Sequence, residues 1–175
     1  MDKKKIALLV HNYFEQSEFE APLMTLRKQG AEVTVISADK IKMQALQRTK
    51  SGRPIEADLL LTAADSDAYD ALVLPGGVVN ADKLRMDMTA RAWVLAFLGS
   101  GRLVAAICHA PWLLVSADVV EERRLTSYYT LQDDIRNAGG EWSDHPVIID
   151  HNLITSRGPN DLPAFTDAIT AWLQD

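Results

Sequence analysis

The sequence predicts an α/β protein with a doubly wound, mostly parallel sheet sandwiched by helices. Short apolar runs alternate with segments of helical spacing along the whole chain, which is typical of strands joined by crossover helices. Within these runs apolar and polar residues do not alternate, which indicates strands buried on both faces of a parallel sheet. In such sheets a ligand site lies beyond the carboxyl ends of the strands, so we expect functional residues in the loops that follow them.

Length and composition are those of one globular domain spanning residues 1–175. The net charge of −6 argues against a nucleic-acid-binding surface, since only Lys3-Lys4-Lys5 forms a basic cluster. The single cysteine excludes an internal disulfide and fits a reducing compartment. No apolar run reaches membrane-spanning length or forms a signal-peptide core. We therefore expect a cytoplasmic protein without membrane or nucleic-acid partners.

The first expected strand covers residues 6–10 and leads through a loop into a helix. Ser17 and Glu20 have the spacing of a capping box, which would place Glu18 in the first helical turn. Pro22 lacks an amide hydrogen, so the alternative is a helix that begins near Pro22. Either start leaves the acidic residues of this loop at the carboxyl end of the first strand.

Gly30 suits the end of this helix, and a second strand is expected at residues 31–37. The next section differs, because residues 42–50 and 55–61 favour short strands around a turn at 51–54. The remaining expected elements are strands at 71–74, 103–107, 125–127, 147–150 and 152–155, and helices at 87–99, 111–117, 131–138 and from Asn160 or Asp161 onward.

The strand at 103–107 leads directly into the only cysteine, Cys108, which His109 and a helix-like segment follow. An apolar strand before a sharp turn and a helix is the layout of a nucleophile elbow. Ala106 and Ala110 leave room for such a turn. Because a helix start favours a thiolate, we expect Cys108 to titrate well below an ordinary thiol. The alternative is a buried structural cysteine at a strand end.

Three loops are expected to meet at this edge of the sheet. The loop after the first strand carries Glu15 and Glu18, which are either solvated acids at a helix start or carboxyl partners of the thiol. Gly76 and Gly77 form either a tight turn or the exposed amides of an oxyanion hole. His109 either serves as a general base or points away from the sulfur.

Four motifs, in this order along the chain, resemble the PfpI family, which belongs to the ThiJ/PfpI branch of the class I glutamine-amidotransferase-like superfamily. They are Phe14-Glu15-x-x-Glu18, Leu74-Pro75-Gly76-Gly77, Ala106-Ile107-Cys108-His109-Ala110-Pro111 and Thr155-Ser156-Arg157-x-Pro159-x-Asp161-Leu162-Pro163. The resemblance spans essentially the whole chain. It implies a flavodoxin-like fold with the nucleophile elbow at the cysteine.

The resemblance also implies roles for individual residues. Cys108 would be the nucleophile or redox centre, with Glu18 hydrogen-bonded to it and His109 as its base. The third acid of the family comes from an adjacent subunit, and Asp82 is a substitute for it here, because the loop at 78–82 is one residue longer. The other implied site residues are Glu15 in the same pocket, Gly76 and Gly77 as oxyanion donors, and Tyr128 as a pocket tyrosine. The implied assembly is a homodimer, or a trimer of dimers.

The resemblance implies a stress-related cysteine hydrolase without cofactor or metal. Its substrate would be a peptide or amide, or methylglyoxal and its adducts in a deglycase or glyoxalase reaction. The alternative is a redox-sensing or chaperone-like protein whose cysteine is oxidised to a sulfinate, with little turnover. The residues themselves argue against three other classes. A glutamine amidotransferase needs a late His-x-Glu pair, a flavodoxin needs a phosphate loop after the first strand, and a metal site needs histidines at ligand spacing.

Overall fold

The computed structural model describes residues 3–174, whose centre is a seven-stranded sheet of order β10-β11-β7-β6-β1-β2-β5. The strands are β1 (Lys5–Val10), β2 (Glu32–Ser37), β3 (Lys42–Gln47), β4 (Lys50–Glu56), β5 (Leu59–Leu60), β6 (Ala71–Leu74), β7 (Leu103–Ile107), β8 (Arg124–Leu125), β9 (Glu141–Trp142), β10 (Val147–Asp150) and β11 (Leu153–Ser156). The helices are α1 (Gln16–Lys28), α2 (Val78–Leu84), α3 (Met88–Gly99), α4 (Pro111–Ser116), α5 (Gln132–Asn137) and α6 (Leu162–Gln174).

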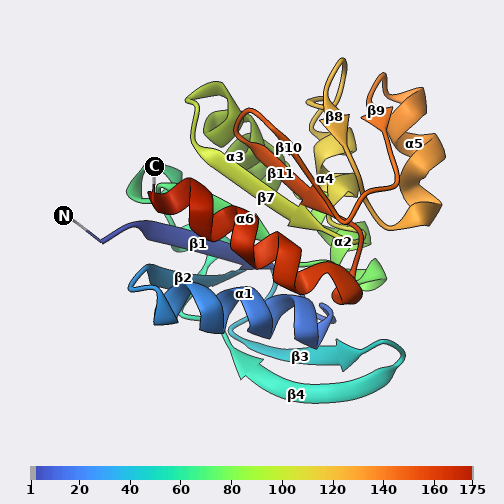
Figure 1. The fold of residues 1–175 in the computed structure, drawn as a ribbon. Coiled ribbons are helices and arrows are strands. Elements are labelled where there is room, and N and C mark those ends of the chain that lie inside the picture. Colours follow the sequence, from blue (N-terminus) through green and yellow to red (C-terminus); the bar gives the residue numbers. More distant parts are fainter. Residues whose placement is uncertain (1–2, 175) are drawn as a thin grey trace.

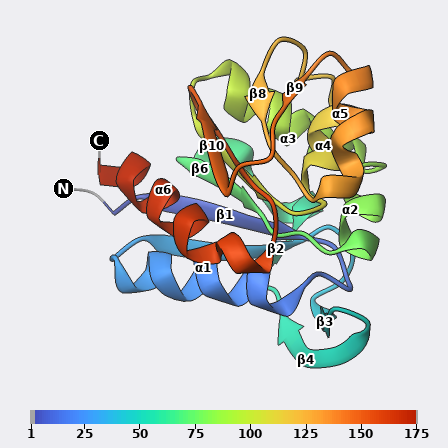
Figure 2. The same cartoon turned by 45° about the vertical axis from the view of Figure 1, so that its right-hand side comes forward.

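The predicted fold class is confirmed. Neighbouring strands of the sheet run parallel except β10, which pairs antiparallel with β11 at one edge. Helices α1 and α6 cover one face, while α2, α3 and α4 cover the other (Figures 1 and 2). Strands β1, β6 and β7 are buried along almost their whole length, because apolar side chains pack against both helical layers. These three strands are adjacent, so the loops at their carboxyl ends meet.

Helix α1 begins at Gln16, earlier than either expected start. Ser17 lies inside its first turn, so the predicted capping box does not form, and Pro22 lies within the helix. The helix ends as expected at Gly30, where φ is +90° and the amide of Ala31 donates to Leu26 O at 3.0 Å. This is the arrangement of a Schellman motif, which satisfies the last carbonyls of the helix.

The expected pair of short strands is present as the β3–β4 hairpin, but its turn lies elsewhere. The turn consists of Arg48 and Thr49, with Arg48 at φ 60°, while residues 51–54 belong to β4. The expected turn was wrong because Gly52 serves a different purpose. It lies in the irregular part of β4, where Gly52 and Arg53 together face Ala45 of β3, and the side chain of Gln44 donates to the Gly52 carbonyl at 2.7 Å. The hairpin projects beyond the sheet (Figure 1).

Two further local expectations differ from the structure. The segment after the double glycine, expected as a loop, forms α2. Before α6, both carboxylate oxygens of Asp161 accept from Arg157, at 2.8 and 3.0 Å, and do not cap the helix. In the part of the chain described here, no helix is both long and apolar enough to cross a membrane.

Candidate active site

The carboxyl end of β7 forms the predicted elbow around Cys108. This residue has a φ of 63°, a left-handed backbone conformation that is uncommon for residues other than glycine. Hydrogen bonds from both flanks hold it there: its amide donates to Ser156 O at 3.0 Å and its carbonyl accepts from Tyr128 N–H at 2.8 Å. The strained turn is therefore fixed by β11 and by the segment after β8.

The three predicted loops meet at this edge. A residue that the sequence analysis did not single out, Asn80, joins two of them by hydrogen bonds. Asn80 on α2 is fully buried. Its side-chain amide donates to the carbonyls of Pro75 and Gly76, and its Oδ1 accepts from the amide of His11 at 2.7 Å. The first and second loops also bond directly, because Glu15 N–H donates to Gly76 O at 3.2 Å.

Glu18 lies beside the thiol with its side chain completely buried. Oε2 accepts from the amide of Gly76 at 2.8 Å. Oε1 has no partner with full hydrogen-bond geometry among residues 3–174, although the carboxyl lies within interaction range of Cys108. Burial raises the pKa of Glu18 to about 8, and nearby Glu15 adds to this effect. At neutral pH the carboxyl therefore holds its proton and can donate it toward the sulfur.

The two glycines have different surroundings, and only the amide of Gly77 is available as a donor. Glu18 occupies the amide of Gly76, so this amide is not free to bind an oxyanion. The amides that face the sulfur are those of Gly77 and His109, and both favour the thiolate of Cys108. Gly77 has a φ of 95°, and a Cβ there would lie 2.7 Å from the amide nitrogen of Glu15. Only glycine fits this close crossing of two loops.

His109 lies against the sulfur, with Nδ1 3.1 Å from Cys108 Sγ. Its ring stacks on Tyr128 at a centroid distance of 4.5 Å and meets Trp112 edge-on at 5.5 Å. Burial lowers the pKa of His109 to about 4, so the imidazole is neutral over the physiological range. A neutral ring nitrogen at this distance can accept the thiol proton.

The titration of Cys108 differs from the expectation. Burial raises the pKa of the thiol above its usual range, and an ionised Glu18 raises it further. Desolvation opposes the effect of the two amides that face the sulfur and outweighs it. The contribution of Glu18 disappears while that carboxyl keeps its proton. The free protein thus holds a thiol next to a neutral base.

The other predicted residues border this centre at different distances. Glu15 is half-buried, and its Oε2 accepts from the amide of Arg48 at 2.9 Å, which anchors the tip of the β3–β4 hairpin at the site. No sequence signal singled out Arg48, because the contact joins residues 33 positions apart. Tyr128 contacts His109 as described, whereas Asp82 is exposed on α2.

Taken together, these groups place a thiol, a neutral base, a protonated carboxyl and two free amides around one point. Residues 3–174 contain no cluster of three or more His, Cys, Asp or Glu that could hold a metal ion. The thiol, the neutral base, the protonated carboxyl and the two amides can support attack of sulfur on a carbonyl carbon.

Known proteins are similar to this chain in sequence and in fold. The sequence model of the DJ-1/PfpI family matches residues 4–171. Protein/nucleic acid deglycase 2 of Escherichia coli is 41% identical over 93% of each chain, and General stress protein 18 of Bacillus subtilis is 35% identical over 98% of each. A two-domain protein from Anabaena variabilis, with DJ-1/ThiJ/PfpI-like and ferritin-like domains, matches with a TM-score of 0.92 and 35% identity. This match covers 98% of the present chain and 48% of that one.

Proposed function

The chain belongs to the DJ-1/PfpI family, and on this premise we propose that it is a cysteine-dependent deglycase, a hydrolase that acts on methylglyoxal and its adducts. The observation that carries the proposal is the contact of 3.1 Å between Cys108 Sγ and the neutral His109. A structural cysteine needs no base in contact with its sulfur. The deglycase name of the E. coli relative supports the choice of reaction.

The first step is addition of sulfur to the carbonyl carbon of the substrate. The thiol proton passes to Nδ1 of His109 as the C–S bond forms, and the π electrons of the carbonyl move to its oxygen. The amides of Gly77 and His109 are placed to bind this oxyanion. Glu18 keeps its proton and donates to the sulfur, so no second negative charge opposes the attack.

The resulting hemithioacetal then rearranges to a lactoyl thioester of Cys108: a proton passes from C1 to C2 through His109, the C1 hydroxyl becomes a carbonyl, and the C2 carbonyl becomes a hydroxyl. Water hydrolyses this thioester to lactate and the free thiol, and the net reaction balances for both substrates. Methylglyoxal plus water gives lactate. An amine adduct of methylglyoxal plus water gives lactate and the free amine. In the second case the sulfur displaces the amine from the carbinol carbon of the adduct: the C–S bond forms, the C–N bond breaks, and the amine nitrogen takes the proton that His109 received from the thiol, which gives the same hemithioacetal.

We place the protein in the cytoplasm as a homodimer in which Asp82 of one chain approaches His109 of its partner. Asp82 is exposed, and α2 starts directly at the site with Val78 and Val79 facing outward at 53% and 39% exposure. Sedimentation at increasing concentration tests the dimer. A monomer at every concentration would contradict the homodimer. An Asp82→Asn variant as active as the wild type would contradict the approach of Asp82 to His109 of the partner.

Turnover tests the deglycase proposal. Methylglyoxal and a methylglyoxal-treated lysine peptide are supplied in large molar excess over the enzyme, and lactate and free amine are measured. We expect many equivalents of product per chain. The name of General stress protein 18 favours a second candidate, a redox-responsive stress protein whose cysteine becomes a sulfinate. Product that stops at one equivalent per chain, with stoichiometric oxidation of Cys108 by peroxide, would favour that candidate and contradict the deglycase.

A further inference from the structure

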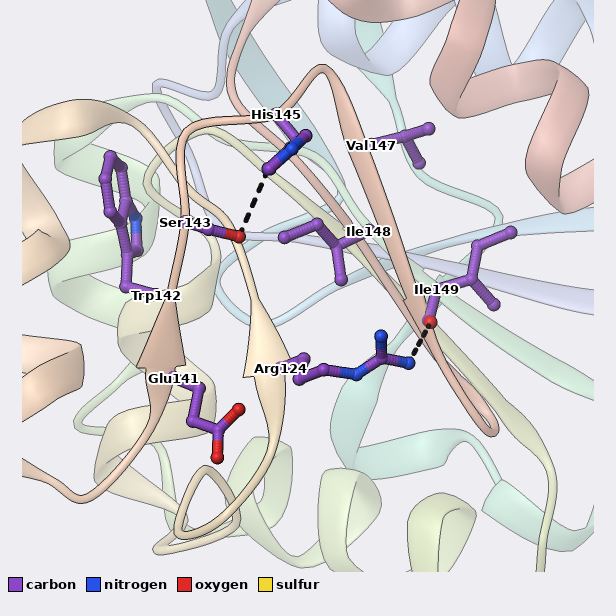
Figure 3. Close-up of a pocket in the computed structure, with 8 residues that line it drawn as sticks. All are labelled: Arg124, Glu141, Trp142, Ser143, His145, Val147, Ile148 and Ile149. Carbon is purple, nitrogen blue, oxygen red and sulfur yellow. Dashed lines mark hydrogen bonds between the residues drawn. The ribbon is translucent and has the colours of Figure 1, made fainter.

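A pocket of about 510 Å³ lies away from Cys108, between the edge strand β10 and the short strands β8 and β9. Figure 3 shows Arg124 at one end of this space, His145 at the other, and Ile148 projecting between them. Its volume is in the range of small-molecule sites. The mechanism proposed above uses none of these residues.

The pocket holds two opposite charges that do not neutralise each other. Arg124 and Glu141 are register partners in the parallel β8–β9 pair, and both line the pocket. They form no ion pair within 4.0 Å, and among residues 3–174 Glu141 has no basic partner at that distance. Arg124 reaches across to β10, where it donates to Ile149 O at 3.4 Å and lies 3.9 Å from Asp150 Oδ1. These long contacts leave most of its donors available.

The β10 wall supplies an apolar side chain and main-chain polar groups. Ile148 is half-buried and projects into the space (Figure 3). Ile149 O faces the pocket, since it accepts from Arg124. In an antiparallel pair the main-chain groups of every second residue share a direction, so those of Val147 also face away from β11. A ligand lying here would meet an aliphatic surface flanked by hydrogen-bonding groups.

We propose that this pocket binds a small zwitterion with an apolar side chain, such as a free aliphatic amino acid or a short peptide. Arg124 would hold its carboxylate, Glu141 its ammonium group, and Ile148 its side chain. Phosphate esters fit less well, because the carboxylate of Glu141 beside the one guanidinium repels a polyanion. A free aliphatic amino acid and a short peptide both carry a carboxylate, an ammonium group and an apolar side chain. The volume of the pocket accommodates either ligand.

Calorimetric titration of the full chain tests the proposal, with leucine, leucyl-leucine, N-acetyl-leucinamide and inorganic phosphate as probes. We expect one saturable site per chain for a zwitterion. Leucine and leucyl-leucine distinguish the two sources, and N-acetyl-leucinamide, which lacks both charges, should not bind. Arg124→Gln and Glu141→Gln should each weaken binding about tenfold, the loss expected for one charge-assisted hydrogen bond.

The exposed residues Lys50 and Glu32 provide matched controls, because Lys50→Gln and Glu32→Gln remove the same charges far from the pocket. Both controls should bind like the wild type, and thermal unfolding should show that all four variants are folded. The proposal is wrong if neither zwitterion binds at millimolar concentration. It is also wrong if phosphate or N-acetyl-leucinamide binds as tightly, or if the pocket variants bind like the controls.

Discussion

Replacing Glu18 by glutamine should change how stability depends on pH. The raised pKa of about 8 means that the folded protein holds a proton that the unfolded chain releases near pH 4.5. The stabilising effect of that proton is complete below pH 4.5 and is lost as pH rises through 8. Over this interval the loss is about 1.4 kcal/mol per pH unit, or about 5 kcal/mol in all.

Glutamine has the shape of a protonated glutamate and cannot ionise. Its Oε1 can accept from Gly76 N–H and its amide can donate toward the sulfur, so both groups keep their partners. We therefore expect Glu18→Gln to match the wild type at pH 4.5 and to exceed its free energy of unfolding by about 5 kcal/mol at pH 8 and above.

Urea denaturation from pH 5 to 9 measures this difference. His109, with its lowered pKa, stabilises the fold at pH values above the ordinary 6.5, and this contribution is lost as pH falls through about 4. That effect is common to both proteins and cancels in the difference. The exposed variant Glu32→Gln should follow the wild type throughout. A constant difference between Glu18→Gln and the wild type across this range would refute a protonated Glu18.

Three further outcomes follow from the structure. The kcat/KM for methylglyoxal should fall above pH 8, where ionised Glu18 raises the pKa of the thiol, and below pH 4, where His109 becomes protonated. Initial rates measured across this pH range check both decreases. A kcat/KM that does not change with pH would contradict both assignments. Gly76→Ala places a Cβ 2.7 Å from Ile107 O and close to Glu18, so it should cost about 1–3 kcal/mol and most of the activity. Its control, Gly99→Ala, meets nothing within 4 Å and should be neutral or slightly stabilising by denaturation. Asp87→Ala removes an N-cap bond of 2.9 Å to Ala90 N–H and should lower the free energy of unfolding by about 1 kcal/mol with unchanged kcat/KM; an unchanged stability would contradict the cap.

Much of the fold could be predicted because the strands carry unbroken apolar runs. Leu72, Val104 and their neighbours are buried on both faces, and their apolar residue types alone predict this burial. The elbow was predictable for a similar reason, since an apolar strand ends at Cys108 and a helix follows. The start of α1 was not, because its N-cap residue Glu15 makes no side-chain capping bond, and tertiary contacts decide where the helix begins.

The details of the site depend on contacts that sequence spacing does not reveal. The amide of Gly76 is taken by a carboxyl 58 positions away, and Arg48 reaches Glu15 only through the hairpin turn. The pKa of Cys108 was mispredicted because the sequence shows that a helix start, which favours the thiolate, follows the cysteine. The desolvation that raises the pKa depends on the packed core, which the sequence does not show.

The proposed reaction depends on a covalent bond between the sulfur of Cys108 and the substrate. The most direct test is the initial rate of methylglyoxal consumption at neutral pH by Cys108→Ala, with the wild type and the folded control Gly99→Ala alongside. We expect Cys108→Ala to react no faster than buffer, while the control matches the wild type. A Cys108→Ala rate within about twofold of the wild type, far from the complete loss expected for a missing nucleophile, would contradict this expectation.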